Sequence, residues 1–177
     1  MKRFLILAAV AVLTVGALGT VSASEGESQR KDVKATLSGF AEVPSISTAG
    51  TGKLRLRIDP TNTTISYELT YSGLEGGAVT GAHLHLGQAG VDGGAIAFLC
   101  NGGGTNPACA PAAGGTMSGA IVAANILPLP AQGIAGPTPA EFAEVLKAIR
   151  AGVVYANVHT ASFPDGEIRG QLKPGKS

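Results

Sequence analysis

The sequence predicts an all-β domain, an antiparallel Greek-key β-sandwich or barrel with one short helix. Glycine and proline together make up 36 of the 177 residues, and this composition favours tight turns. Between those turns, roughly eight short segments are rich in β-branched residues or alternate apolar with polar side chains. No regular alternation of strands with helices is visible, so a parallel α/β sheet is excluded.

Residues 1–23 are interpreted as a signal peptide. Lys2 and Arg3 form a basic start, residues 4–18 are apolar, and Val21-Ser22-Ala23 fits the small-residue pattern of a cleavage site. We therefore expect cleavage near Ala23 and a secreted or periplasmic mature protein.

The mature chain is predicted to hold a single domain. Residues 24–32 are polar and charged and are expected to be a disordered lead-in, residues 33–172 form the domain, and residues 173–177 are a tail. Without the two basic residues of the signal peptide, 11 Lys and Arg face 12 Asp and Glu, a net charge of −1. The sequence thus indicates no nucleic-acid partner, and no later stretch is long and apolar enough to span a membrane.

The first part of the domain is predicted to form three strands. Residues 33–40 are the first. Residues 52–58 alternate strictly between apolar and polar side chains, as expected for a half-buried strand. Turn residues at 59–62 precede a second alternating segment at 65–71, so these two strands should form a hairpin.

The later part predicts five further strands and one helix. The strands are expected at residues 79–86, 95–99, 116–122, 153–160 and 167–172. The proline-containing stretch 123–137 is a connection rather than a central strand.

The helix has clear boundary signals. Thr138 is the expected N-cap, Pro139 the first helical residue, Glu141 the partner in a capping box, and Gly152 the stop. One face is apolar and should pack against an end of the β-structure; it consists of Phe142, Val145, Leu146 and Ile149.

Cys100 and Cys109 are the only cysteines and are predicted to form a structural disulfide. An exported protein meets an oxidising environment, and closing a loop of this length contributes roughly 2.7 kcal/mol in the chain-entropy model. The alternative, a metal site with two thiolates, lacks both a CxxC spacing and a nearby histidine.

All three histidines lie in predicted strands. His83 and His85 should project from one face of their strand, and His159 could join them from a neighbouring strand. Three imidazoles with an open fourth position suit copper or zinc. In the alternative interpretation, His83 and His85 are polar residues on a solvated face and His159 caps the end of its strand.

Other charged residues complete the candidate site. Asp92, Asp165 and Glu167 could add an oxygen ligand or orient an imidazole. Glu167 and Arg169 share a face of the last strand, and a simple ion pair between them is the favoured interpretation. The sequence contains no GxSxG elbow, P-loop or Rossmann fingerprint.

With these residues, the sequence resembles the chordin domain family, usually called CHRD. The resemblance covers residues 33–172 and rests on residues 52–58 and on four motifs: Ala41-Glu42-Val43-Pro44, Gly81-Ala82-His83-Leu84-His85, Tyr155-Ala156-Asn157-Val158-His159-Thr160 and Pro164-Asp165-Gly166-Glu167-Ile168-Arg169-Gly170-Gln171-Leu172. The family occurs in an extracellular antagonist of bone morphogenetic proteins and in exported microbial proteins. The resemblance implies an immunoglobulin-like β-barrel similar to copper/zinc superoxide dismutase.

The similarity to the dismutase also implies roles for single residues. His83, His85 and His159 look like three copper ligands, and Arg169 looks like the arginine that guides the anionic substrate. The chain has no further histidine for the metal-bridging ligand or the zinc subsite. The resemblance is therefore compatible with a mononuclear copper or zinc site and excludes a complete copper/zinc dismutase.

Two functional hypotheses follow. The favoured one is a non-enzymatic extracellular or periplasmic module that binds an unidentified protein or matrix partner through a face or edge of its sheet, because the full dismutase ligand set is missing. The other is a mononuclear copper- or zinc-binding protein with dismutase-like redox activity. The second hypothesis requires His83, His85 and His159 to converge within a few ångströms, since each metal–nitrogen bond is only about 2 Å long.

Overall fold

The computed structural model describes residues 31–175. Within that range the chain forms one α-helix, three short 3₁₀ helices and nine strands. The strands are β1 (Lys31–Ser38), β2 (Thr51–Ile58), β3 (Ile65–Ser72), β4 (Val79–Leu86), β5 (Ala95–Cys100), β6 (Gly114–Ile121), β7 (Val154–Thr160), β8 (Ile168–Gln171) and β9 (Lys173–Pro174).

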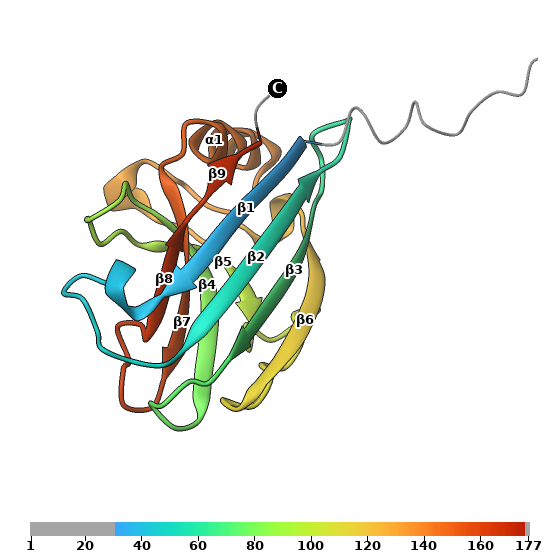
Figure 1. The fold of residues 1–177 in the computed structure, drawn as a ribbon. Coiled ribbons are helices and arrows are strands. Elements are labelled where there is room, and N and C mark those ends of the chain that lie inside the picture. Colours follow the sequence, from blue (N-terminus) through green and yellow to red (C-terminus); the bar gives the residue numbers. More distant parts are fainter. Residues whose placement is uncertain (1–30, 176–177) are drawn as a thin grey trace, which may run out of the picture.

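The strands form one antiparallel sheet that curls into a nearly closed barrel (Figure 1). Their order is β5-β4-β7-β8-β1-β2-β3-β6, and β9 pairs with β1 beside β8. The predicted all-β antiparallel class with one helix is confirmed. The predicted signal peptide lies outside the described residues, whereas β1 begins at Lys31, two residues inside the predicted lead-in.

The half of the barrel around β2 and β3 follows the predicted alternation. Leu54, Leu56 and Ile58 are buried, and β2 pairs with β3 in a regular antiparallel hairpin. The first strand ends at Ser38, before the predicted end at residue 40, because residues 39–41 turn into the 3₁₀ helix η1 (Gly39–Ala41). A Cβ atom at Gly39 would lie 2.4 Å from the carbonyl oxygen of Ile46, so this close approach of two backbone segments needs glycine.

The other half is centred on β7, all seven residues of which are buried. β7 lies between β4 and β8 in the sheet. In a strand, alternate side chains face opposite sides of the sheet. The alternate residues Val154, Ala156 and Val158 belong to the hydrophobic core, so Tyr155, Asn157 and His159 project from the outer face of the sheet and are buried there.

The helix α1 (Pro139–Arg150) closes one end of the barrel (Figure 1). Its predicted apolar face is confirmed, since Phe142, Val145, Leu146 and Ile149 are all buried. The Thr138 hydroxyl accepts a hydrogen bond from the Glu141 backbone N–H at 3.2 Å, as expected of an N-cap. The reciprocal half of the predicted capping box is absent, because the Thr138 N–H donates to the carbonyl of Gly136 instead.

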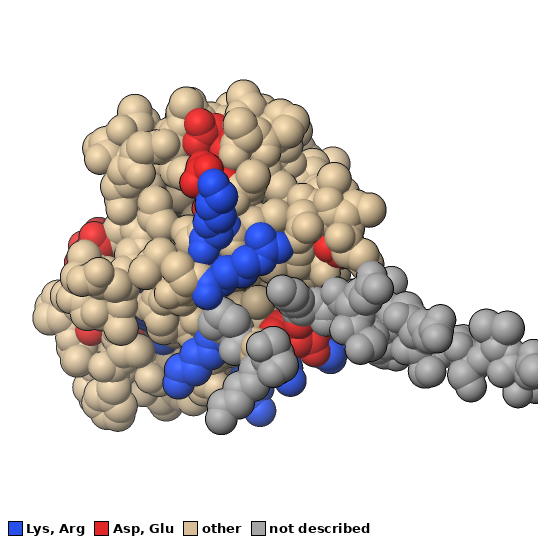
Figure 2. Space-filling view, turned by 90° about the horizontal axis from the view of Figure 1, so that it is seen from above, with Lys and Arg blue, Asp and Glu red and all other residues tan. Residues whose placement is uncertain are grey.

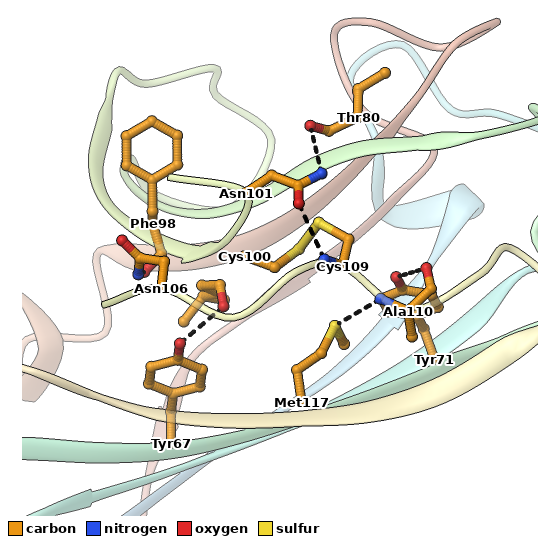
Figure 3. The surroundings of a disulfide bond; sticks show 11 residues. Tyr67, Tyr71, Thr80, Phe98, Cys100, Asn101, Asn106, Cys109, Ala110 and Met117 are labelled. Carbon is orange, nitrogen blue, oxygen red and sulfur yellow. Dashed lines mark hydrogen bonds between the residues drawn. A yellow bond between two sulfur atoms is a disulfide. The ribbon is translucent and has the colours of Figure 1, made fainter. Parts of the chain in front are cut away.

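The predicted disulfide between Cys100 and Cys109 is confirmed (Figure 3). Asn101 stabilises the loop that the disulfide closes. The side-chain oxygen of Asn101 accepts a hydrogen bond from the Cys109 N–H at 3.1 Å, and its side-chain amide nitrogen donates to the carbonyl of Thr80 at 3.3 Å. The disulfide therefore closes the loop after β5, and Asn101 fixes that loop against the start of β4.

The surface of the α1 end carries scattered charged side chains of both signs among uncharged residues (Figure 2). On the neighbouring strands, Asp32 forms ion pairs with Arg55 and Arg57. No helix in residues 31–175 is long and apolar enough to cross a membrane.

Candidate metal centre

The pairing of β4 with β7 brings the three histidines together on the outer face of the sheet. In this register His83 lies opposite Asn157, and Gly81 lies opposite His159. The ring centroids of His83 and His159 are 4.7 Å apart, and that of His85 is 5.5 Å from His83 and 5.6 Å from His159. One potential ligand nitrogen from each ring lies within 4.8 Å of the others. The arrangement thus has the convergence that a three-histidine metal site requires.

Backbone carbonyls orient two of the rings. The Nδ1 atom of His85 lies 2.9 Å from the carbonyl oxygen of Gly93, and the Nδ1 atom of His159 lies 2.9 Å from that of Pro164. A carbonyl only accepts, so each Nδ1 must carry the proton and donate, which leaves a lone pair on each Nε2. Both Nε2 atoms are buried and have no hydrogen-bond partner among the described residues, and the same holds for Nδ1 of His83.

Each ring therefore contributes one buried nitrogen that lacks a partner. Leaving such an atom unpaired costs about 1–3 kcal/mol, and folded proteins avoid it unless the atom has another use. A metal ion bound by the three lone pairs would satisfy all of them at once.

The imidazoles are neutral at physiological pH. Burial, with repulsion from His159 and His85, lowers the pKa of His83 to about 4. Burial also lowers the pKa of His85 to about 4, although the hydrogen bond to Gly93 opposes this shift. The pKa of His159 is lowered by burial as well. Neutral imidazoles are the form that coordinates metals.

Aromatic rings pack around the cluster. The Phe98 ring meets His83 edge-on at a centroid distance of 4.7 Å, and Tyr155 stacks on His85 at 4.9 Å. These contacts limit the rotation of two of the three imidazoles, which preorganises the candidate ligands.

Arg169, the predicted anion guide, is 2 % exposed and anchors a loop. Its Nη1 atom lies 3.0 Å from Asp92, its Nη2 atom donates to the carbonyls of Gln88 and Val91, and its guanidinium lies 3.5 Å above the Tyr155 ring. These contacts hold residues 88–92 over the outer face. The anion-guiding role stays a prediction.

Glu167 does not pair with Arg169, so the predicted ion pair between them is wrong. The buried Glu167 carboxylate instead accepts four hydrogen bonds, from the hydroxyls of Thr48 and Thr160 and the backbone N–H groups of Glu75 and Gly76, at 2.6 to 3.0 Å. It joins two loops to the β7–β8 hairpin. The hydrogen bonds that orient the imidazoles come from backbone carbonyls rather than from the predicted carboxylates Asp92, Asp165 or Glu167.

Sequence reasoning also missed a second buried carboxyl group near this face. Glu42 is 7 % exposed and Asn157 is 3 % exposed, and an interaction with the Asn157 side chain lowers the pKa of Glu42. The only sequence signal for Glu42 was its place in the motif Ala41-Glu42-Val43-Pro44, since no periodicity marks it as buried.

Comparison with known proteins gives one match. The family model described as the CHRD domain matches residues 33–172. No curated protein and no solved structure matches the chain significantly.

Proposed function

The chain belongs to the CHRD domain family, and from this premise we propose that it is a mononuclear copper- or zinc-binding protein with His83, His85 and His159 as ligands. One observation carries the proposal: each imidazole has a buried nitrogen atom without a partner among the described residues, and the three rings each offer a potential ligand nitrogen within 4.8 Å of the others. A polar nitrogen on a solvated face, the alternative interpretation of the sequence, would be exposed to water.

The spacing of the rings supports this assignment. In a tetrahedral site with metal–nitrogen bonds of about 2.0–2.1 Å, the ligand nitrogens lie about 3.3 Å from one another. The candidate nitrogens lie within 4.8 Å of one another. Inward shifts of less than about 1 Å per ring would therefore complete the coordination, which small side-chain rotations can supply.

The ligand set favours copper or zinc and leaves a position open. Imidazole ligands suit both metals, and a three-histidine site offers its fourth position to water or a small anion. Bound copper would add one-electron redox chemistry, of which dismutase-like activity is one form, whereas zinc has no redox chemistry. The carbonyls of Gly93 and Pro164 would hold two of the ligands in the coordinating tautomer.

The non-enzymatic binding module, which the sequence favoured, stays a second candidate. It is supported by membership of the CHRD family and by the expected export, and it needs no metal. Metal binding and partner binding are compatible, because the histidines occupy only part of the outer face.

The test is calorimetric titration of tag-free protein starting near Ser24 with copper(II) and with zinc(II). We expect one metal ion per chain, and no such binding in the variant His83→Ala/His85→Ala/His159→Ala. The matched control is Glu144→Gln, which removes an exposed carboxylate on α1 and should bind metal as the wild type does. Electron paramagnetic resonance of the copper(II) form should show coupling to three nitrogens. Equal metal uptake by the wild type and the triple variant would refute the proposal.

A further inference from the structure

A second candidate site lies beside the histidine cluster. Three loops, at residues 42–46, around Asp92 and at residues 162–166, line a cavity of about 430 Å³ that is open to solvent. Its apolar walls include Val43, Pro44 and Phe163, and its acidic groups are Glu42, Asp92 and Asp165. The cavity thus combines apolar walls with three carboxyl groups.

Glu42 is an incompletely bonded carboxyl group in the wall of this cavity. Its Oε1 atom is buried and has no hydrogen-bond partner within residues 31–175, and neither has Oδ1 of Asn157. The Asn157 amide nitrogen already donates to the carbonyl of Asp165 at 3.2 Å. Both unpaired atoms are oxygens, so when Glu42 is ionised this part of the cavity lacks a hydrogen-bond donor.

The charges around Glu42 leave the cavity acidic. Burial raises the pKa of Glu42 to about 7; Arg169 and the Asn157 side chain lower this pKa, and Asp92 raises it. The positive charge of Arg169 is already engaged with Asp92, whose side chain is 67 % exposed, and Asp165 is exposed. A ligand that brings a positive charge and N–H donors would complement these groups.

The surface around the cavity is unusually apolar. Of the four large hydrophobic residues that are exposed in the described chain, three lie in the loops that carry Glu42 and Asp92: Phe40 at 75 %, Val43 at 36 % and Val91 at 44 %. Apolar side chains beside a pocket that accepts a charged anchor are typical of the centre of a protein interface.

We propose that this cavity is the docking site for a partner protein that inserts a lysine or arginine side chain. The aliphatic stem of the inserted side chain would pack against Val43, Pro44 and Phe163, and its cationic head would donate to Glu42 and Asp165. Apolar residues next to it would cover Phe40 and Val91. A free metal ion is a poorer match, because the histidine triad is the one group of metal-ligating side chains that converges in the described residues.

The proposal is tested by selecting random linear peptides on phage against the tag-free protein. We expect the enriched peptides to share a lysine or arginine with an apolar neighbour. In a synthetic copy of the best peptide, replacing that basic residue by glutamine should weaken binding roughly tenfold or more, since a buried charge pair is lost. Amide resonances of residues 40–46, 91–92 and 162–166 should shift on binding.

Variants of the protein locate the site. Glu42→Gln should weaken peptide binding roughly tenfold, and the exposed Asp165→Asn about two- to fivefold. Phe40→Ala should also weaken it, and Glu144→Gln should not. If Glu42→Gln disturbs folding, Asp165→Asn and Phe40→Ala still test whether the peptide binds at this cavity, because both replace exposed side chains.

The inference does not depend on metal binding. The variant that lacks all three histidines should bind the peptide as the wild type does, so failure of the metal proposal leaves this one standing. The docking proposal would be overturned by any of three results: no peptide is enriched, the enriched peptides lack a basic residue, or the substitutions at positions 40, 42 and 165 do not change peptide affinity.

Discussion

The imidazole of His85 stacks on the ring of Tyr155, with centroids 4.9 Å apart and planes inclined by 16°. β7 lies between β4 and β8, so Tyr155 has His85 on one side and the guanidinium of Arg169 on the other. The Gly93 carbonyl receives both the His85 Nδ1–H and the Tyr155 hydroxyl, and the Gly93 N–H donates to the same hydroxyl. The orientation of His85 therefore depends on Tyr155.

Replacing Tyr155 by phenylalanine should weaken metal binding although Tyr155 is not one of the proposed ligands. Tyr155→Phe keeps the stacked ring but removes both hydrogen bonds to Gly93. We expect the free energy of unfolding to fall by about 1–2 kcal/mol and metal affinity to fall about tenfold, since ring orientation is lost. Urea denaturation and calorimetric titration of the same preparation measure both.

The matched control is Tyr71→Phe, which removes a hydroxyl bonded to the Ala110 carbonyl near the disulfide (Figure 3). It should cost similar stability and leave metal affinity unchanged. Equal affinities for Tyr155→Phe and the wild type would show that the hydroxyl does not position His85.

Replacing Glu167 by glutamine should destabilise the fold strongly. The carboxylate accepts four hydrogen bonds, whereas the amide nitrogen of glutamine would face two of those donors without accepting from them. We expect a loss of about 2–4 kcal/mol in the free energy of unfolding, measured by urea denaturation. Glu144→Gln, at an exposed ion pair with Lys147, should change stability by less than about 0.5 kcal/mol.

The same substitution should change the response to acid. Burial raises the pKa of Glu167, but the hydrogen bonds from Glu75, Thr48, Thr160 and Gly76 outweigh burial and bring it below the ordinary 4.5. The carboxylate therefore stabilises the fold above pH 4.5, and this contribution is lost as the pH falls through the lower folded pKa. As the pH falls below 4.5, Glu167→Gln should lose less stability than the wild type. Equal losses would contradict the lowered pKa of Glu167.

The parts of the fold that could be predicted from the sequence are those determined by residues close together in the chain. Strict alternation located β2 and β3, a two-residue spacing placed His83 and His85 on one face, and boundary residues located α1. Each of these signals is contained within a few positions of the chain, where backbone geometry fixes the direction of the side chains.

The contacts that sequence reasoning missed join loops that are distant in the chain. Thr48 and Glu167 are 119 positions apart, and Asp92 and Arg169 are 77 positions apart. Strand periodicity carries no information about which loops meet over a sheet. Two charges at alternate positions of one strand, Glu167 and Arg169, were therefore paired with each other although each has its partners elsewhere.

The metal-free protein should lose stability as the pH falls from about 6.5 to 4. The ordinary pKa of histidine is 6.5, and burial lowers that of His83 and His85 to about 4. Between these values the unfolded chain binds protons that the folded chain does not, so acid favours unfolding. Urea denaturation with a chelator present measures the effect. Replacing all three histidines by glutamine should make the free energy of unfolding less dependent on pH in this range. An unchanged pH dependence would contradict the shifted pKa values.

Replacing Glu42 by glutamine should stabilise the protein at alkaline pH. Burial raises the pKa of Glu42 from 4.5 to about 7, so the folded chain holds a proton that the unfolded chain has released between these values. The stability linked to that proton is complete below pH 4.5 and is lost as the pH rises through 7. Glutamine never ionises, so Glu42→Gln should exceed the wild type by about 1–3 kcal/mol at pH 8 and match it near pH 4.5. Urea denaturation at both pH values measures this difference in the free energy of unfolding. Glu144→Gln is the control for a general effect of removing a negative charge. A difference between Glu42→Gln and the wild type that does not depend on pH would show that Glu42 ionises at an ordinary pKa.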